Sequence, residues 1–452
     1  MKKTILPILF SILTINCLIA QPLIGPEELK SDIDFLISKY EKIHPNLYAY
    51  TDSATFKKKI RFLENGLTDS ITSLDFWLKL TPIVNCLKDG HTSISPNYND
   101  VGLYTETFKS KYKYLPFSVY IIDSVIYLEE IYGHQKKVIP SGSVIESING
   151  YSSHNILKAL IGYKSGERLE YRLKNVQKTF MWDYTMVFPA TEYEIEYYDG
   201  NNIQKHVLFG ISDEETNVYS SKAFPEIPDY IFRITENNIG YIEYNECQNL
   251  DKFKIFLDSS FSIIRQNNVE KLIIDIRRNG GGDSKLNDLL FTYLYNKPFH
   301  SYGKIEAVIT DEIKKPFGYT QFKNDTIIEL DTYENNKHTN NLFFLGKVYL
   351  LTSTFTFSSG ADCAMLFKDY NVGTIIGQET GGLPTSYGDT YKFKLPNSGL
   401  NARVSWKFFL RPSGENDGRG VIPDIPIEYS INDLITGKDL EMDNVLKLIN
   451  AE

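Results

Sequence analysis

Apolar side chains in the first part of the chain recur at the three- and four-residue spacing of amphipathic helices. The first stripe consists of Leu29, Ile33, Leu36, Ile37 and Tyr40. The second consists of Phe56, Ile60 and Leu63, behind the capping candidates Asp52 and Ser53. A third helical pattern begins near Ser73, and Gly90 is expected to end it in a left-handed C-cap. This region therefore predicts three helices.

After about residue 101 the pattern changes to short runs of β-branched and aromatic residues. Three of them, separated by turns, predict strands over 117–122, 125–131 and 193–198. From about residue 228, largely apolar runs alternate with helical patterns. The runs predict strands over 239–244, 272–276, 348–353 and 374–377. Mostly apolar strands separated by helices indicate a sheet with helices on both faces.

The beginning of the chain has the composition of a secretory leader. Lys2 and Lys3 precede a mostly apolar run that ends at Ala20. A charged start, a short apolar stretch and a small residue before the cut predict a signal peptide over residues 1–20 and an exported protein. Lipid attachment at Cys17 is an alternative, although Asn16 before it fits that signal poorly. The run is short for a membrane span.

Composition excludes several function classes. The 452 residues exceed what one hydrophobic core usually holds, which indicates several domains. A net charge of −9 without a basic block argues against a nucleic-acid partner. Beyond the leader the chain has three scattered cysteines, Cys86, Cys247 and Cys363, and no zinc-ligand spacing. We therefore expect neither a disulfide scaffold nor a structural metal site.

Three polar segments could carry chemistry. Residues 88–93 hold His91 in Asp-Gly-His-Thr, which could also be a helix cap with an incidental histidine. Residues 275–284 hold three glycines between a strand and a helix, where backbone N–H groups can approach an anion, or where the chain merely turns. Residues 353–362 place several hydroxyls at a strand-to-helix junction, as nucleophile or as N-caps.

In this order the segments resemble the serine peptidase family of C-terminal processing peptidases, tricorn protease and the retinoid-binding protein repeats. Asp-x-Arg-x-Asn-x-Gly-Gly begins at Asp275, Thr-Phe-Ser-Ser at Thr356 and Gly-Gln-Glu-Thr-Gly-Gly at Gly377. Gly-Val-Ile-Pro-Asp begins at Gly420, and residues 139–150 resemble part of a PDZ domain. The resemblance implies an α/β multi-domain fold. Its parts are a helical domain over 21–100, a PDZ-like domain over 101–225 and a catalytic core of the ClpP/crotonase-like type over 226–452.

The resemblance also implies the reacting groups. Alignment through Asp369 and Gly377 makes Ser358 the nucleophile, and a shift of one residue would choose Ser359. The lysine base of the processing peptidases is missing from residues 380–386. A serine needs a base, so His91 takes that role, as in the tricorn-like branch. Asp417, with Glu415 as its rival, is expected to orient the imidazole.

The remaining expectations concern the oxyanion and the substrate. Backbone N–H groups of Gly281 and Ser359 would bind the oxyanion, while Asp275, Arg277, Asn279 and Gly280 shape the glycine turn. No metal or organic cofactor is implied. The resemblance implies a peptide or protein substrate, which strand addition to the PDZ-like domain could hold by its C-terminus. A binder of lipid or another hydrophobic ligand on the same fold is the alternative, because fold does not dictate function.

Overall fold

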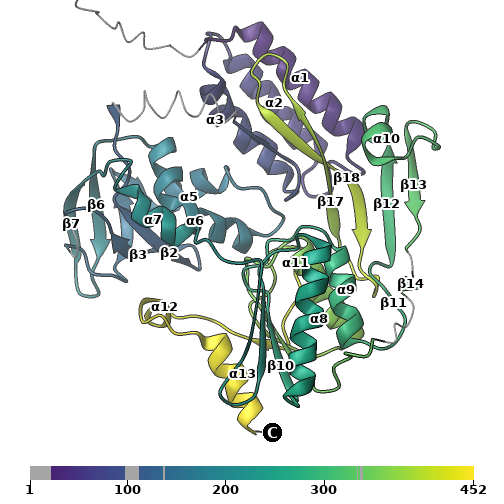
Figure 1. Cartoon of the computed structure of the whole chain (residues 1–452). Helices are drawn as coiled ribbons and strands as arrows, with labels where there is room; N and C mark the ends of the chain where they lie inside the picture. Colours follow the sequence, from purple (N-terminus) through teal and green to yellow (C-terminus); the bar gives the residue numbers. More distant parts are fainter. Residues whose placement is uncertain (1–21, 97–110, 136–137, 333, 336–339, 452) are drawn as a thin grey trace, which may run out of the picture.

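The computed structural model describes residues 22–96, 111–135, 138–332, 334–335 and 340–451. The described chain is a multi-domain mixture of helices and sheets, which confirms the α/β class (Figure 1). Within these ranges no helix is long and apolar enough to cross a bilayer. The expected leader and Cys17 lie outside the described residues.

The N-terminal helices pack against a sheet formed mostly by the second half of the chain (Figure 1). The helices are α1 (Pro26–Ile43), α2 (Ser53–Gly66) and α3 (Ser73–Val84). The strands are β1 (Ser93–Ser95), β12 (Lys304–Ile309), β13 (Thr326–Leu330), β17 (Ser386–Lys394) and β18 (Asn401–Leu410). Leu36 and Phe76 of the helices share one hydrophobic cluster with Val404 and Trp406 of β18. Helices and sheet therefore form one packing unit.

The three expected helices form, but the predicted end of the third is wrong. α3 stops at Val84, and a short 3-10 turn, η1 (Asn85–Leu87), follows it. The left-handed residue is Lys88, with φ 61°, and not Gly90. Pro82 lies in the last turn of α3 and has no N–H to donate to the Leu78 carbonyl, which weakens the end of the helix. The early end leaves residues 88–92 as a loop that carries His91.

The region that the sequence predicted to be PDZ-like forms a separate sheet with its own hydrophobic cluster. This region, from β2 to α7, is called the PDZ-like part below. Its strands are β2 (Phe117–Ile122), β3 (Val125–Ile131), β4 (Val144–Ile148), β5 (Tyr151–Ser152), β6 (Glu192–Tyr198) and β7 (Ile203–Phe209). Its helices are α5 (Ser153–Ile161), α6 (Leu169–Val187) and α7 (Thr216–Ala223). The order β2-β3-β4-β6-β7 makes β2 an edge strand, and α6 packs against it.

The core is a six-stranded sheet in the order β19-β16-β15-β10-β9-β8. Its strands are β8 (Tyr230–Ile234), β9 (Gly240–Tyr244), β10 (Lys271–Asp275), β15 (Lys347–Thr352), β16 (Thr374–Gly377) and β19 (Ile425–Pro426). All neighbours pair in parallel except β8 with β9. The predicted strands of this region therefore form in a largely parallel sheet.

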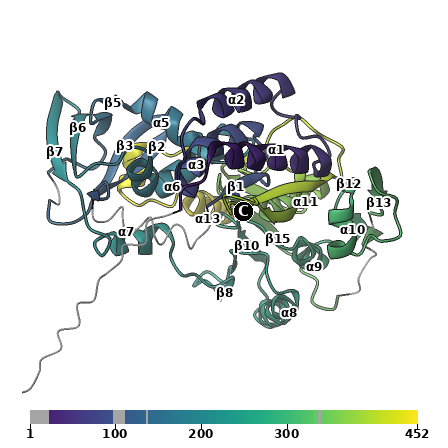
Figure 2. The same cartoon turned by 90° about the horizontal axis from the view of Figure 1, so that it is seen from above.

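Helices cover both faces of this sheet, as the apolar strands predicted (Figure 2). One face packs against α8 (Leu250–Gln266), α9 (Lys285–Leu294) and α11 (Ser359–Tyr370). The other packs against α13 (Leu440–Ala451). The smaller elements are α10 (Asp311–Phe317), α12 (Ile431–Ile435), β11 (Phe299–His300) and β14 (Glu334–Asn335). The carboxyl ends of β10 and β15 lead into the glycine turn and Ser358.

Asp32 joins α1 to the turn between β17 and β18. Its buried carboxylate accepts the backbone N–H groups of Asn397 and Ser398, at 2.9 and 2.7 Å, and the Ser398 hydroxyl. A carboxylate that accepts several bonds leaves buried donors unsatisfied when it is removed.

Asp32→Ala should therefore lower the free energy of unfolding by about 3 kcal/mol, because at least two buried donors lose their acceptor. Asp34→Ala is the matched control, since Asp34 is exposed on the same helix, and it should change stability by less than about 0.5 kcal/mol. Urea unfolding curves of both variants measure the difference. Equal curves would contradict the anchoring role of Asp32.

Candidate active site

Ser358 lies in a tight turn between β15 and α11. Its backbone has φ 50° and ψ −130°, a region that side-chain-bearing residues rarely adopt. The turn is fixed on both sides: Phe357 N–H donates to the Asn279 carbonyl at 3.0 Å, and Gly360 N–H donates to the Phe357 carbonyl at 2.9 Å. The serine stays part-exposed at the start of a helix. Strain of this kind is concentrated at functional sites.

The His91 ring reaches Ser358 from the unit that the N-terminal helices form with the sheet of β18. His91 Nε2 lies 3.0 Å from Ser358 Oγ, although the two residues are 267 positions apart. This is hydrogen-bond distance for a base and its nucleophile. The Ser359 hydroxyl instead donates to the Gly282 carbonyl at 2.8 Å. The geometry therefore favours Ser358 over Ser359 as the partner of His91.

Aromatic side chains enclose the imidazole. Its ring stacks on Phe357, with centroids 5.2 Å apart, and Phe357 in turn stacks on Tyr171 of α6 at 4.5 Å. Burial lowers the pKa of His91 below its ordinary value of about 6.5, and the charge of Asp89 opposes this fall. At neutral pH the ring is therefore mostly uncharged, and Nε2 can accept a proton.

The glycine turn after β10 lies against the serine. Gly281 has φ 105°, and a Cβ at this position would lie 2.7 Å from Ser358 Cβ and 2.9 Å from Ser359 N. Its N–H donates to Asn279 Oδ1 at 2.9 Å. The turn thus supplies an acceptor of its own for this N–H, and the role of Gly281 as an oxyanion donor stays a prediction. Ser359 N–H, at the start of α11, has no acceptor among the described residues.

Comparison with known proteins identifies this arrangement. Residues 238–427 match the model of "Peptidase family S41". The core of this chain is thus similar to peptidase family S41, and it is called the S41 core below. Tricorn protease of Thermoplasma acidophilum is 26% identical over 228 residues, which are 49% of this chain and 18% of that protein. This chain thus spans under a fifth of the length of the curated relative that it matches.

Solved structures show that the similarity of fold extends beyond the S41 core. Mature CPAF complexed with lactacystin superposes with a TM-score of 0.64 at 15% identity, over 94% of this chain and 98% of that chain. A CPAF mutant gives a TM-score of 0.67 at 14% identity, over 91% and 94%. These likenesses show a shared fold over more than nine-tenths of the chain.

The carboxylates predicted to orient the imidazole lie elsewhere. Glu415 pairs with Arg411 at 3.0 Å, and its side chain is 64% exposed. Asp417 is exposed and accepts the Arg419 N–H at 3.0 Å. Neither makes a hydrogen bond or ion pair with His91 in the described chain. The expectation of a contact with the ring is wrong, because both carboxylates are in an exposed loop and interact with residues of that loop.

Asp89 is the carboxylate beside the imidazole. Its Oδ1 accepts the His91 N–H at 2.9 Å and lies 4.0 Å from His91 Nδ1. Its Oδ2 accepts the Ser405 hydroxyl at 2.6 Å and lies 3.0 Å from His44 Nε2. Burial alone would raise the pKa of Asp89, but the His44 bond and nearby histidine charges hold it below its usual range. Asp89 belongs to the Asp-Gly-His-Thr motif, but nothing in the motif indicated that its carboxylate would lie beside the imidazole.

Residues from the PDZ-like part complete the surroundings of His91. Glu167 Oε1 accepts the Gly90 N–H at 3.0 Å, and burial together with the Asp89 charge raises the pKa of Glu167 to about 8. Arg168 pairs with Glu379 at 3.0 Å and also donates to the Thr380 carbonyl. Both residues precede α6 and lie in no recognisable motif, so the sequence offered no signal for them.

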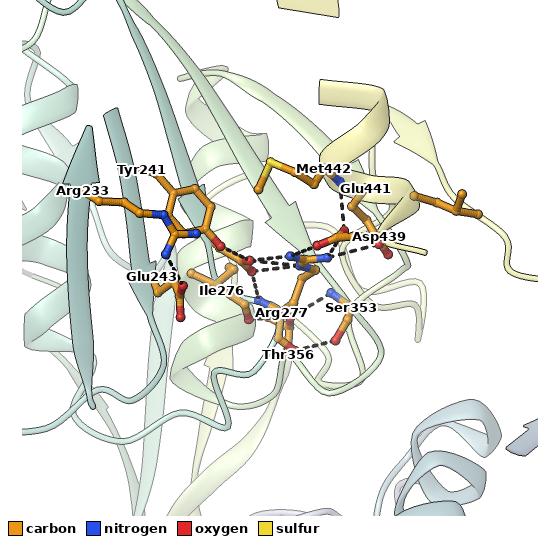
Figure 3. A network of polar contacts seen from close by, with 12 residues as sticks. Arg233, Tyr241, Glu243, Ile276, Arg277, Ser353, Thr356, Asp439, Glu441 and Met442 are labelled. Atoms are coloured by element: carbon orange, nitrogen blue, oxygen red, sulfur yellow. Dashed lines mark hydrogen bonds and ion pairs between the residues drawn. The ribbon is translucent and has the colours of Figure 1, made fainter. Parts of the chain in front are cut away.

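Arg277, one of the residues expected to support the glycine turn, is the centre of a polar network (Figure 3). Arg277 contacts Asp275 at 2.7 Å and Asp439 at 2.6 Å, and its carbonyl accepts the Ser353 hydroxyl. Asn279 Nδ2 donates to the Tyr244 carbonyl at 3.0 Å. Gly280 has open space where a Cβ would stand. The charged network ties the turn to β15 and to the loop before α13, away from the histidine–serine pair.

Gly281→Ala should abolish most of the reactivity of Ser358, because the new methyl group overlaps the serine side chain and positive φ disfavours alanine. We expect the rate of labelling by a fluorophosphonate to fall at least a hundredfold. Gly280→Ala is the matched control in the same turn, and it should keep the greater part of the labelling rate. Normal labelling of Gly281→Ala would show that the turn does not need to approach the serine.

Proposed function

We propose that this chain is an exported serine peptidase that cleaves peptide bonds through an acyl-enzyme on Ser358. The 3.0 Å separation between His91 Nε2 and Ser358 Oγ carries the proposal. An uncharged imidazole at that distance can take the hydroxyl proton as the oxygen attacks a carbonyl carbon. The retained pair of serine and base favours catalysis over the alternative of a lipid-binding protein.

In the acylation step, Ser358 Oγ bonds to the carbonyl carbon while His91 Nε2 takes the serine proton. The tetrahedral adduct then collapses, the C–N bond breaks, and His91 returns the proton to the leaving amine. In deacylation a water molecule replaces the amine: His91 takes a proton from it as its oxygen attacks the ester. The carboxylic acid leaves, and the serine regains its proton.

The oxyanion needs donors, and the helix start provides one. Ser359 N–H, at the positive end of α11 and next to the nucleophile, has no acceptor in the described part of the chain. Gly281 N–H is the second proposed donor. The substrate oxygen would have to displace Asn279 Oδ1 from this N–H or share the N–H with it. Asp89 takes the place proposed earlier for the loop carboxylates, because its charge favours the imidazolium form during the reaction.

The substrate class follows from the family and the domain arrangement. Peptides or proteins are the substrates of S41 peptidases, and the leader-like start of the chain supports export. The PDZ-like part docks beside the serine through Arg168 and Tyr171. We propose that it holds the substrate chain near its C-terminus, as in processing of a protein tail.

Ser358→Ala should lower kcat for a peptide substrate by about four or more orders of magnitude, because the covalent step is lost. Ser359→Ala should cost far less, since its proposed role uses the backbone N–H. Labelling by a fluorophosphonate followed by peptide mapping identifies the reacting residue directly. A dead Ser359→Ala enzyme with a reactive Ser358→Ala enzyme would overturn the assignment.

The activity should rise with pH as His91 loses its proton, with a midpoint in kcat/KM below about 6.5. The direction follows from the lowered pKa of the buried ring: the base works only when neutral, so activity is lost as pH falls through that pKa. His91→Ala should remove this limb together with most of the activity. A fully active His91→Ala enzyme, measured from pH 4 to 9, would contradict the role of His91.

A further inference from the structure

A second histidine lies beside Asp89, in no recognisable motif of the sequence. His44 caps the carboxyl end of α1, and its side chain is only 1% exposed. Its Nε2 lies 3.0 Å from Asp89 Oδ2. The ring also packs against Tyr387 of β17, with the ring centroids 4.7 Å apart. His44 therefore contacts the carboxylate beside the base through the oxygen that does not face His91.

A backbone contact fixes where the proton of the His44 ring lies. The Asn46 N–H donates to His44 Nδ1 at 3.0 Å. Nδ1 is thus an acceptor, so the ring proton is on Nε2 and is donated to Asp89. The other donors to Asp89 Oδ2 are the hydroxyls of Thr92 and Ser405, at 2.5 and 2.6 Å. A hydroxyl can rotate and can also accept, whereas the His44 N–H is held in one direction.

The two oxygens of Asp89 have different partners. Oδ2 accepts from His44 and the two hydroxyls, whereas Oδ1 accepts the His91 backbone N–H at 2.9 Å and lies 4.0 Å from His91 Nδ1. The negative charge of Asp89 favours the imidazolium that forms when the His91 ring takes the serine proton. A group that keeps Asp89 ionised and in place therefore supports the base.

The charge of Asp89 depends on its donors because the carboxyl group is buried. Burial alone would raise its pKa, and the hydrogen bond from His44 is the largest of the influences that lower it. A buried carboxylate that loses a donor takes up a proton more readily. Without the His44 donor, Asp89 is therefore expected to become protonated at a higher pH.

The other titratable and charged groups around this loop change little between pH 4 and 7. Burial, together with the charge of Asp89, raises the pKa of Glu167 to about 8, so its carboxyl group is mostly protonated in that range. Arg403 of β18 is permanently charged, and Asp389, whose charge acts on the His91 ring, pairs with Lys407 at 2.6 Å. Burial raises the pKa of three neighbouring tyrosines, which stay uncharged: Tyr40, Tyr50 and Tyr387.

We propose that His44 is a positioning residue for the base, which holds Asp89 ionised with Oδ1 towards His91. The His44 N–H binds one oxygen of the carboxylate, and the other oxygen acts on the His91 ring as that ring takes the serine proton. His44 acts through Asp89 and transfers no proton itself. The proposal deepens the proposed function and rests on it, because it assigns a further residue to the same reaction.

The test compares two substitutions of His44. His44→Phe keeps a ring and removes the donor, whereas the amide of His44→Gln reaches about as far as Nε2 and keeps a donor for Asp89. Between pH 7 and pH 5, His44→Phe should lose about tenfold more of its kcat/KM on a peptide than the unaltered chain, because a protonated Asp89 no longer supports the imidazolium. His44→Gln should follow the pH profile of the unaltered chain to within about threefold.

Tyr40→Phe is the matched structural control. It removes the hydrogen bond from the Tyr40 hydroxyl to the Ser93 carbonyl, at 3.0 Å, and leaves every donor of Asp89 in place. It should keep the pH profile even if thermal unfolding shows a loss of stability. If His44→Phe does not fold, His44→Asn replaces it, since the shorter amide does not reach Asp89. A profile unchanged by loss of the donor, or one that His44→Gln fails to restore, would show that His44 is merely structural.

Titration of the His91 ring separates this proposal from the proposed function. The chain has seven histidines, so NMR of ¹⁵N-labelled histidine can follow His91 in the Ser358→Ala chain. His44→Phe should lower the midpoint of the His91 titration by about half a pH unit or more, because a neutral Asp89 no longer favours the charged ring, and His44→Gln should not.

Labelling of the unaltered chain by a fluorophosphonate completes the test. If the reagent fails to label Ser358 while the shift of the His91 midpoint is present, the peptidase function is wrong and the positioning role of His44 stands. If labelling is normal and the shift is absent, the positioning role is wrong.

Discussion

The site depends on the strained backbone of Ser358. A φ of 50° at a residue with a side chain costs about 1–3 kcal/mol, and neighbouring contacts must maintain it. Glycines surround this turn because nothing larger fits: a Cβ at Gly382 would lie 2.8 Å from Ser358 N, and one at Gly281 would meet the serine Cβ. The network of Arg277 below the turn secures the same loop to the sheet. The packed surroundings thus hold the hydroxyl in place before any substrate arrives.

Contacts from three parts of the chain fix the position of His91. The loop with His91 is fixed through Asp89 to Ser405 of β18, and through Gly90 to Glu167 before α6. Phe357 lies between His91 and Tyr171, so one ring belongs to the S41 core, one to the helical unit and one to the PDZ-like part. A shift of the PDZ-like part would therefore change the packing around the imidazole. The position of α6 is thus coupled to the packing around the base.

Much of the fold was predictable because periodicity reports burial. The alternation of Leu272, Ile273 and Ile274 between the two faces of β10 is the pattern of a strand with helices on both sides. Ser358 and His91 were predictable as candidates because each lies in a short motif, and these motifs follow one another along the chain in the order of the family. The prediction that Asp417 or Glu415 orients the imidazole was wrong. Their position just before the last motif does not reveal that Glu415 pairs with Arg411 instead. Glu167 and Arg168 could not be predicted, because their importance arises only from the docking of the PDZ-like part.

The pairing of β1 with β18 has a consequence for the order of events during synthesis. Residues 93–95 pair with residues 401–403, so the segment that holds His91 has no partner strand until more than 300 further residues have been made. The buried cluster shared by the first helices and Trp406 imposes the same delay. An unfinished chain therefore lacks an assembled histidine–serine pair, and the two residues can meet only after almost the whole polypeptide has folded. The topology itself thus delays assembly of the histidine–serine pair until the chain is nearly complete.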